Sequence, residues 1–382
     1  MKSNKIRLGE QCVVTSSKRF HLSERITQGV PFYCSKEIIK KFNGEDVTEC
    51  DYISEDLYKK VSNEFGVPKE NDLLITTRGT IGIPYLYKRT DRFYFADGNL
   101  TWIKDFDSNL YSKFLYYWFQ SYEGRKKFEA LAKGTAQKAV PISGIKTLEI
   151  ELPSLKDQKR IVDILSAYDD LIENNQKQIK LLEEAAQRLY KEWFVDLRFP
   201  GHENTKIVDG VPEGWRRGLL KELISVNYGK DHKKAPDDGN IPVYGSGGLM
   251  RKCNKSLFSG EAVLIPRKGS LNNIMYVDET FWTVDTMFYA TMKQPHTAVF
   301  VYFFVKAFDM YSMNIGAAVP SMTTKILDAM DVVIPDKETL EKFDKLTKTY
   351  FNKIKTLQGQ NERLKIARDL LLAKLMSGEV EV

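Results

Sequence analysis

The 382-residue sequence predicts an α+β protein in which two globular α/β units are separated by an intramolecular antiparallel coiled coil of two long helices. Two stretches carry apolar side chains at alternating three- and four-residue spacing, the pattern of a helix that lies along another helix. Each of these stretches follows a block with mixed helix and strand patterns. The two blocks repeat the same order of motifs, which implies a pseudo-twofold internal repeat.

The first long helix is expected over residues 153–199. Pro153 precedes Ser154, and Asp157 follows three residues later, a spacing close to a capping box. No proline or glycine interrupts the run before Pro200, so at 1.5 Å per residue the helix is roughly 60 Å long. Its seam positions are Ile161, Leu165, Tyr168, Ile172, Asn175, Ile179, Leu182, Ala186, Leu189 and Trp193.

The second long helix is expected over residues 336–382, with Asp336 as its N-cap after Pro335. Gly359 lies inside it and costs about 1 kcal/mol relative to alanine. Either run could instead be an amphipathic helix on a globular core, but long seams that occur twice favour a helix pair. The second seam is Leu340, Phe343, Thr347, Tyr350, Ile354, Leu357, Asn361, Leu364, Arg368, Leu371 and Leu375.

An antiparallel arrangement matches every seam position of the first helix with one of the second when the paired residue numbers sum to 536. This register pairs Ile161 with Leu375 and places Asn175 opposite Asn361 near the midpoint. Buried asparagines often set the register of a coiled coil at a cost in stability. Asn175 and Asn361 are therefore the predicted register residues of the helix pair.

The first globular unit is expected over residues 1–152. The stretch from Asp72 to Gly82 reads as two strands joined by a tight turn at Arg78-Gly79. Aromatic residues at 85, 87, 93 and 95 alternate with other residues, as in half-buried strands. A buried helix is expected over 110–120, a polar loop over 134–138 and a closing strand over 145–152.

The second globular unit, with a connector before it, is expected over residues 200–335. It repeats the order of the first: Glu261–Ser270 corresponds to the strand and turn at Asp72–Thr80, and 299–305 corresponds to the helix at 110–120. The loop at Gly316 and the proline at 335 follow Gly134 and Pro153 by the same 182 residues. Trp215 is expected to anchor the connector to this unit.

Composition narrows the classes of protein to which the chain can belong. The net charge of +6 and the pI near 8.8 only mildly suggest an anionic partner. The longest apolar runs are far shorter than the ~18 residues of a membrane span. The four cysteines and four histidines have neither zinc-ligand nor disulfide-framework spacing. We therefore expect a cytoplasmic protein without cofactor, metal site or membrane contact.

Sequence motifs of catalysis are also absent. The chain contains no methyltransferase Asp/Asn-Pro-Pro-Tyr/Phe motif, no GxxxxGK[S/T], no GxSxG and no HExxH. The glycine-rich stretch Gly245–Gly248 lacks a following lysine-threonine pair, so we interpret it as a turn rather than a phosphate-binding loop. These observations favour a binding protein over an enzyme.

The alternation of two globular units with two long seam helices resembles the specificity subunit of type I restriction-modification systems. Local matches are Leu152–Ile161, Leu171–Asn175, Leu189–Phe194 and Val211–Trp215, and the resemblance spans the whole chain. It implies that each globular unit is a target recognition domain for one half of a bipartite double-stranded DNA site. It also implies that the helices form a spacer and dock two methyltransferase subunits, and that restriction (motor) subunits join the full complex. The family's specificity subunit has no catalytic residues.

Candidate DNA-binding residues are basic and amide side chains in loops, since arginine can contact guanine, glutamine can contact adenine, and lysines mostly meet phosphates. Each could equally be a solvated surface charge. The rival hypotheses are an oligomeric structural adaptor whose seam helices pair between chains and, more distantly, a nucleotide-using enzyme. The candidates are Lys18, Arg19, Arg78, Lys133, Gln137 and Lys138 in the first unit, and Lys233, Lys234, Arg251, Lys252, Arg267 and Lys268 in the second.

Overall fold

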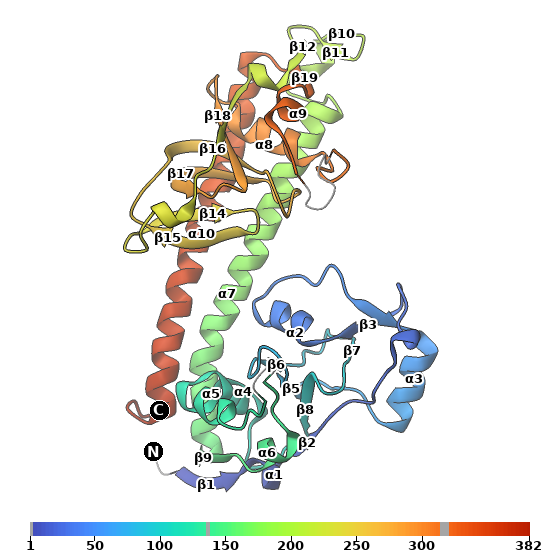
Figure 1. Ribbon diagram of the computed structural model, residues 1–382, viewed down its shortest axis with the longest axis vertical. Helices are drawn as coiled ribbons and strands as arrows, with labels where there is room; N and C mark the ends of the chain where they lie inside the picture. Colours follow the sequence, from blue (N-terminus) through green and yellow to red (C-terminus); the bar gives the residue numbers. More distant parts are fainter. Residues whose placement is uncertain (1–2, 135–137, 314–320) are drawn as a thin grey trace. The chain divides into compact units, whose positions relative to one another are not determined.

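The computed structural model describes residues 3–134, 138–313 and 321–382 (Figure 1). The chain divides into two compact units: unit 1 comprises Met1–Lys177 and Gln358–Val382, and unit 2 comprises Gln178–Leu357. Two long helices, α7 (Leu155–Tyr190) and α10 (Lys337–Ser377), each contribute one stretch to either unit. Within the described ranges, no helix is long and apolar enough to cross a membrane.

Unit 1 is built on a four-stranded antiparallel sheet in the order β2-β8-β5-β6. A second sheet, β4-β3-β7, pairs β3 antiparallel with β4 and parallel with β7, and β1 pairs with β9. The strands of unit 1 are β1 (Ser3–Arg7), β2 (Val13–Thr15), β3 (Val30–Tyr33), β4 (Asp51–Ile53), β5 (Leu73–Thr76), β6 (Pro84–Leu86), β7 (Tyr94–Phe95), β8 (Leu100–Lys104) and β9 (Glu149–Pro153). Its other helices are α1 (Leu8–Gln11), α2 (Ser35–Phe42), α3 (Glu55–Glu64), α4 (Ser112–Gln120), α5 (Tyr122–Glu129) and α6 (Ile142–Lys146).

Both faces of the central strand β5 are buried. Leu73 and Ile75 pack on one side with α4 and the long helices, whereas Leu74 packs on the other with the aromatic residues of the second sheet. Neighbouring strand residues point to opposite faces, so a strand buried on both sides reads as a continuous apolar run. Tyr85, Tyr87, Phe93 and Phe95 are buried, as the alternating pattern at 85–95 predicts. Tyr94 is buried as well, so β7 is buried on both faces and not half-buried as expected.

Unit 2 contains a six-stranded sheet in the order β13-β18-β16-β17-β14-β15, antiparallel except for the β14–β17 pair. Two small sheets, β12-β19 and β10-β11, complete it. Its strands are β10 (Ile207–Val208), β11 (Val211–Pro212), β12 (Arg216–Leu219), β13 (Ile224–Tyr228), β14 (Ile241–Gly245), β15 (Gly248–Cys253), β16 (Phe258–Pro266), β17 (Met275–Thr283), β18 (Met287–Met292) and β19 (Asp331–Ile334), and its short helices are α8 (Ala298–Lys306) and α9 (Thr324–Asp328).

The two units repeat one plan. In unit 1, β1 pairs with β9 directly before α7, and in unit 2, β12 pairs with β19 directly before α10. The buried helix α8 takes the place of α4, and β16 takes the place of β5. The internal repeat inferred from the sequence is thus present in the fold. The repeated loop at residues 316–320 lies outside the described residues.

Side-chain caps start both long helices, as their sequences predict. The backbone N–H of Asp157 donates to Ser154 Oγ at 3.2 Å, and that hydroxyl donates to the Asp157 carboxylate at 2.8 Å. Asp336 accepts from the backbone N–H of Thr339 at 2.9 Å and from Trp215 Nε1 at 2.8 Å. The side chain of Trp215 thus fastens the connector to the start of α10 within unit 2.

Three expected boundaries differ from the structure, one of which is the end of α10, expected at residue 382 and found at Ser377. The closing strand of unit 1 begins only at Glu149, because residues 142–146 form the short helix α6 after Pro141, a residue suited to a helix start. The first long helix, expected over residues 153–199, is α-helical only to Tyr190 and continues as a π-helical turn over Lys191–Val195.

In unit 1, α7 and α10 run antiparallel in the predicted register. Asn175 Nδ2 donates to Asn361 Oδ1 at 2.9 Å, and both side chains are buried. Nearby, Arg368 pairs with Asp169 at 2.6 Å, and Asp169 also accepts from the Tyr117 hydroxyl of α4 at 2.6 Å. Burial and the adjacent carboxylate raise the pKa of Tyr117, which keeps its hydroxyl a hydrogen-bond donor. This network attaches α4 to both long helices.

In unit 2, the helix pair follows the same register, since the rings of Trp193 and Phe343 lie 5.8 Å apart. The helices are not only a spacer, however. Trp193 and Phe343 belong to the core of unit 2 together with α8, and Val162 and Leu372, which lie off the seam, belong to the core of unit 1. The expectation that the seams serve only a helix–helix contact is therefore too narrow. Off-seam apolar side chains widen the buried stripe at both ends of each helix.

Candidate nucleic-acid interface

The turn after β5 presents an exposed arginine. Thr76 and Thr77 are buried, whereas Arg78, Gly79 and Thr80 are exposed. Gly79 has φ of +74°, which glycine adopts without the cost that a side chain would impose. The side chain of Arg78 thus emerges at the point where the sheet ends, held by a sharply turned backbone.

The backbone brings two further lysines to this turn. Arg78 forms an antiparallel bridge with Ala139, and the backbone N–H of Gly79 donates to the Lys138 carbonyl at 3.3 Å. Lys133 and Ala139 exchange both backbone hydrogen bonds, at 2.8 and 2.9 Å. Arg78, Lys133 and Lys138 are all exposed, so three of the predicted DNA-binding cations converge. Gln137 lies outside the described residues.

The other predicted pair of unit 1, Lys18 and Arg19, lies in the loop after β2. Both side chains are exposed, and the backbone N–H of Lys18 donates to the Tyr94 hydroxyl at 2.9 Å. Arg19 pairs with Asp97 at 3.3 Å. The chain then passes from Asp97 to Asn99, whose carbonyl accepts from the Thr77 backbone N–H at 2.9 Å. The Lys18-Arg19 loop and the Arg78 turn are thus linked through residues 97–99.

Unit 2 builds its turn in the same way. Lys268 bridges Ser321 as Arg78 bridges Ala139, and the Met322 N–H donates to the Arg267 carbonyl at 2.9 Å as Val140 does to Thr77. Residues 321 and 322 follow 139 and 140 by 182, the offset found in the sequence. Lys268 is therefore the counterpart of Arg78.

Arg267 has a different environment from Lys268. Its guanidinium lies 5.5 Å from the centre of the Tyr228 ring and donates to the Asp285 carbonyl at 3.0 Å. The two residues were expected to act as a pair in the equivalent turn. In the structure, Lys268 is exposed and Arg267 is half-buried.

Arg251 and Lys252 lie in strand β15 rather than in a loop as expected, and Arg251 is engaged by other residues of unit 2. Its guanidinium pairs with Asp237 and donates to the carbonyl oxygens of His232 and Ala235, the latter at 2.7 Å. These contacts hold the loop over residues 231–237, which also carries the exposed Lys233. Lys252 next to it is exposed. The side chain of Lys234 is outside the described part of the structure.

Several residues at these turns escaped the sequence analysis. Asn273 Nδ2 donates to the Ser246 carbonyl at 2.9 Å, and a Cβ at Gly269 would lie 2.9 Å from Ser246 Oγ, so the glycine-rich turn at 245–248 lies beside the Lys268 turn. The Tyr311 hydroxyl donates to the Gly269 carbonyl at 3.2 Å. In unit 1, the missed residue is Lys104, whose ammonium lies 4.3 Å from the Trp102 ring centre. The spacing Trp-x-Lys in a strand, which puts both side chains on one face, is the signal that could have found it. In the described ranges, no three His, Cys, Asp or Glu residues group as metal ligands.

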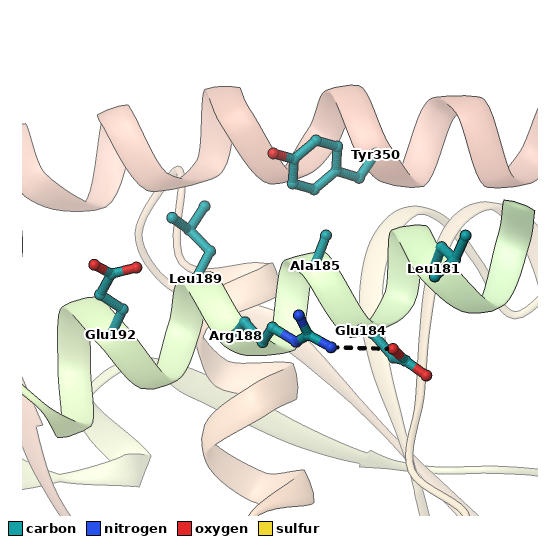
Figure 2. Close-up of a pocket in the computed structure, with 7 residues that line it drawn as sticks. All are labelled: Leu181, Glu184, Ala185, Arg188, Leu189, Glu192 and Tyr350. Atoms are coloured by element: carbon teal, nitrogen blue, oxygen red, sulfur yellow. Dashed lines mark hydrogen bonds and ion pairs between the residues drawn. The ribbon is translucent and has the colours of Figure 1, made fainter.

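The helix pair carries a second surface feature. In unit 2 a hollow lies between α7 and α10, and Figure 2 shows Ala185 and Leu189 of α7 directed toward Tyr350 of α10. Glu184 and Arg188 form an ion pair at its edge at 3.4 Å. Leu181 at this hollow is exposed, and other exposed apolar side chains on the same helices are Ile164 and Leu171 on α7 and Leu346, Ile366 and Leu370 on α10.

Comparisons with known proteins agree with this architecture. The family model described as "Type I restriction modification DNA specificity domain" matches residues 3–184 and 212–365. The chain is 26% identical over 312 residues to the type I restriction enzyme MjaIX specificity subunit of Methanocaldococcus jannaschii, covering 71% of this chain and 69% of that protein. It is 23% identical over 361 residues to the MjaVIII specificity subunit of the same organism, covering 85% and 83%.

A solved structure shares the fold. The crystal structure of a type I restriction-modification system S subunit from M. genitalium matches with a TM-score of 0.59 and 19% identity, covering 98% of this chain and 96% of that one. The family model accounts for most of the chain in two segments, one for each repeat. The chain therefore belongs to the family of type I restriction-modification specificity subunits, which recognise DNA sequence and have no catalytic activity of their own.

Proposed function

We propose that the two units read the two halves of a bipartite double-stranded DNA target, one half-site per unit. The observation that carries this proposal is the repeated turn. Arg78 in unit 1 and Lys268 in unit 2 are exposed residues in equivalent backbone bridges, each at the end of a central strand. Two copies of one recognition surface within one chain suit two separate half-sites.

The residues divide by chemistry. Arg78 suits bidentate contact with guanine, whereas the lysines suit phosphates, which position a protein without specifying sequence. We assign to phosphate contact Lys18, Lys133, Lys138, Lys233, Lys252 and Lys268. Arg251 is assigned to holding its loop, because its guanidinium already binds a carboxylate and two carbonyl groups. Arg19 and Arg267 remain candidates whose side chains have partners within the chain.

Selection of bound duplexes from a random library tests the proposal. The chain is purified together with its methyltransferase, and selection is repeated with the chain alone. The expected result is two short conserved sequences separated by a spacer of fixed length. A single contiguous motif would contradict one half-site per unit, and no enrichment in either preparation would favour a structural adaptor without a DNA role.

We further propose that the helix pair docks two methyltransferase subunits, through which restriction subunits join, in the cytoplasm. Ile366 and Leu370 support docking, because these two exposed side chains lie one turn apart on α10 and exposed apolar patches often mark protein interfaces. Leu181, which is 63% exposed and borders the hollow of Figure 2, is the sharpest test position.

Replacement of Leu181 by Asp puts a charge into the proposed interface and is expected to reduce co-purification of the methyltransferase at least tenfold. Gln187→Asp is the matched control, since Gln187 is an exposed polar residue on the same helix. Equal recovery of the methyltransferase with both variants would remove the hollow from the docking surface.

A further inference from the structure

Unit 1 contains a pocket that the proposed recognition turns do not explain. It has a volume of about 350 Å³ and is formed by β2, β8, the loop over residues 16–19 and Phe65, which follows α3. Pockets of this size accommodate small ligand groups. Its position along the edge of the main sheet places it beside the Lys18-Arg19 loop.

Three cations line the pocket, and its lining includes no carboxylate among the described residues. The ammonium of Lys18 lies 4.8 Å from the centre of the Phe65 ring, and that of Lys104 lies 4.3 Å from the Trp102 ring. Arg19 is the third. The ammonium of Lys104 also lies 3.8 Å from the carboxylate of Asp105. The aromatic rings therefore position two of the charges, leaving the ammonium groups able to meet an anion.

A serine hydroxyl in the pocket lacks a partner. Ser17 Oγ is buried and forms no hydrogen bond with any described residue, although Ser17 lines the cavity. Buried polar groups are almost always hydrogen-bonded, since an unpaired one costs free energy. A hydroxyl can donate to an anion, so this group points to a ligand with acceptor oxygens.

We propose that this pocket seats a phosphate of the DNA backbone, with Lys104 and Ser17 completing a site formed with Lys18 and Arg19. The inference rests on the proposed DNA-reading role of unit 1. A phosphate suits the site better than a base, because Trp102 and Tyr94 are buried and the exposed ring of Phe65 already has the ammonium of Lys18 over its face.

The spacing between this site and the Arg78 turn fits one groove of DNA. Thr76, next to the turn, pairs with Leu100, and Lys104 lies four residues further along β8. At 3.4 Å per residue this is about 14 Å, close to the ~12 Å width of the major groove. A side chain in the groove and a phosphate at its edge are therefore within reach of one unit.

The test is the salt dependence of binding to the selected duplex, measured on the complex with the methyltransferase. Each lost phosphate contact lowers the slope of log K against log salt by about 0.9. Lys104→Gln is expected to show this smaller slope. The affinity of the complex for the duplex then falls about 3.5-fold less than that of the wild type when salt rises from 50 to 200 mM. Base preferences should be unchanged, and Lys104→Arg should restore the slope.

The control is Arg89→Gln, which removes one exposed charge after β6, two strands away from β8 in the sheet. The wild-type complex must first bind its duplex selectively. If the salt slope of Lys104→Gln then equals that of the control, the phosphate site is overturned. Absence of selective binding by the wild type would instead reject the proposed function. The two failures are thus distinguishable.

Ser17→Ala provides an independent readout. If the hydroxyl donates to a phosphate, the variant binds DNA more weakly although its resistance to urea is unchanged or increased, because an unpaired buried group has been removed. Unchanged DNA affinity contradicts the role of Ser17. Titration with inorganic phosphate at constant ionic strength distinguishes the source of the ligand. Saturable phosphate binding that Lys104→Gln abolishes, without a change in the DNA slope, would show a site for free phosphate and overturn the assignment to DNA.

Discussion

The environments of individual arginines separate recognition from support. Arg78 has an exposed side chain on a backbone held by hydrogen bonds, whereas the guanidinium of Arg251 donates to a carboxylate and two carbonyl groups of its own unit. The sequence suggests a loop position for both arginines, although Arg251 lies in strand β15. The difference between them is one of partners, and it leads to opposite expectations for substitution.

Arg78→Ala should weaken binding to the selected duplex by about 5- to 150-fold, the equivalent of the 1–3 kcal/mol of a base-edge contact. The loss of base discrimination should be confined to one half-site. Arg89→Ala is the matched control, because β5 and β6 are antiparallel and Arg89 lies beyond the opposite end of the strand pair. Competition binding with duplexes mutated in either half-site measures this. Altered preference in both half-sites would count against modular recognition.

Arg251→Ala should act on stability rather than on sequence preference. Its removal leaves partly buried carbonyl groups without their donor, which typically costs about 1–3 kcal/mol. The adjacent Lys252→Ala should stay within about 0.5 kcal/mol of the wild type, since Lys252 is exposed. Urea unfolding followed by fluorescence compares the two. Full stability of Arg251→Ala would mean that the loop does not depend on this residue.

At the scale of elements, the long helices depend on their caps and on one polar layer. Burial of Asp336 by itself disfavours its charge, but hydrogen bonds from Thr339 and Trp215 outweigh this and lower its pKa. A carboxylate whose folded pKa is lowered stabilises the fold above its unfolded pKa of about 3.9. That contribution is lost as the pH falls through the folded value.

Asp336→Asn should therefore retain the cap but lose part of the acid sensitivity. Asparagine caps helices about as well as aspartate, so the variant remains folded at pH 7 and loses less stability than the wild type between pH 7 and pH 3. Asp336→Ala, which removes the cap itself, should cost about 1 kcal/mol at pH 7. Urea midpoints at the two pH values provide the comparison. An equal acid-induced loss in wild type and Asp336→Asn would contradict the assignment.

The Asn175–Asn361 layer should behave as a coupled pair. Asn175→Leu leaves the buried amide of Asn361 without its 2.9 Å partner and should cost about 1–3 kcal/mol. The double variant Asn175→Leu/Asn361→Leu should recover that loss, because an apolar layer has no unpaired group. A double-mutant cycle in urea measures the coupling, and additive effects would show that the two amides do not depend on each other. The role of this pair in setting the register stays a prediction.

At the scale of the whole molecule, we propose that the helix pair acts as a ruler between half-sites. One heptad inserted after Asn175 and another before Asn361 keeps the seams in phase and adds about 10 Å. That corresponds to about three base pairs, which also rotate the duplex by about 100°. A heptad turns the seam by only about 20°. The longer helix pair then matches the distance between the half-sites, but it does not match their rotation about the duplex axis.

The expected outcome is either a longer preferred spacer with weaker binding, or loss of two-half-site binding while single half-sites are still bound weakly. Selection from a library with varied spacers measures both. Insertion in only one helix is the control, because it shifts the seams relative to each other and should destabilise the pair. An unchanged spacer at full affinity would mean that the helices do not set the distance.

The helix pair and its register could be predicted from the sequence because both depend on a local property, the spacing of apolar side chains. A seam indicates which face of a helix is buried. When two seams carry matching polar positions, those positions indicate one antiparallel alignment of the two helices. The Asn175–Asn361 contact and the Trp193–Phe343 contact both agree with it. The repeat was also visible because the same motifs recur in the same order.

Only the tertiary structure decided which cations share a surface and which are already engaged. Arg78 and Lys133 are far apart in sequence, and the backbone of Ala139 brings them together. Arg251 is engaged by carbonyl groups of a separate loop, and Lys104 is held over Trp102 in the pocket that Ser17, with its unpaired hydroxyl, also lines. The charge of a side chain is fixed by its residue type, but its availability depends on neighbours that the fold brings from distant parts of the chain.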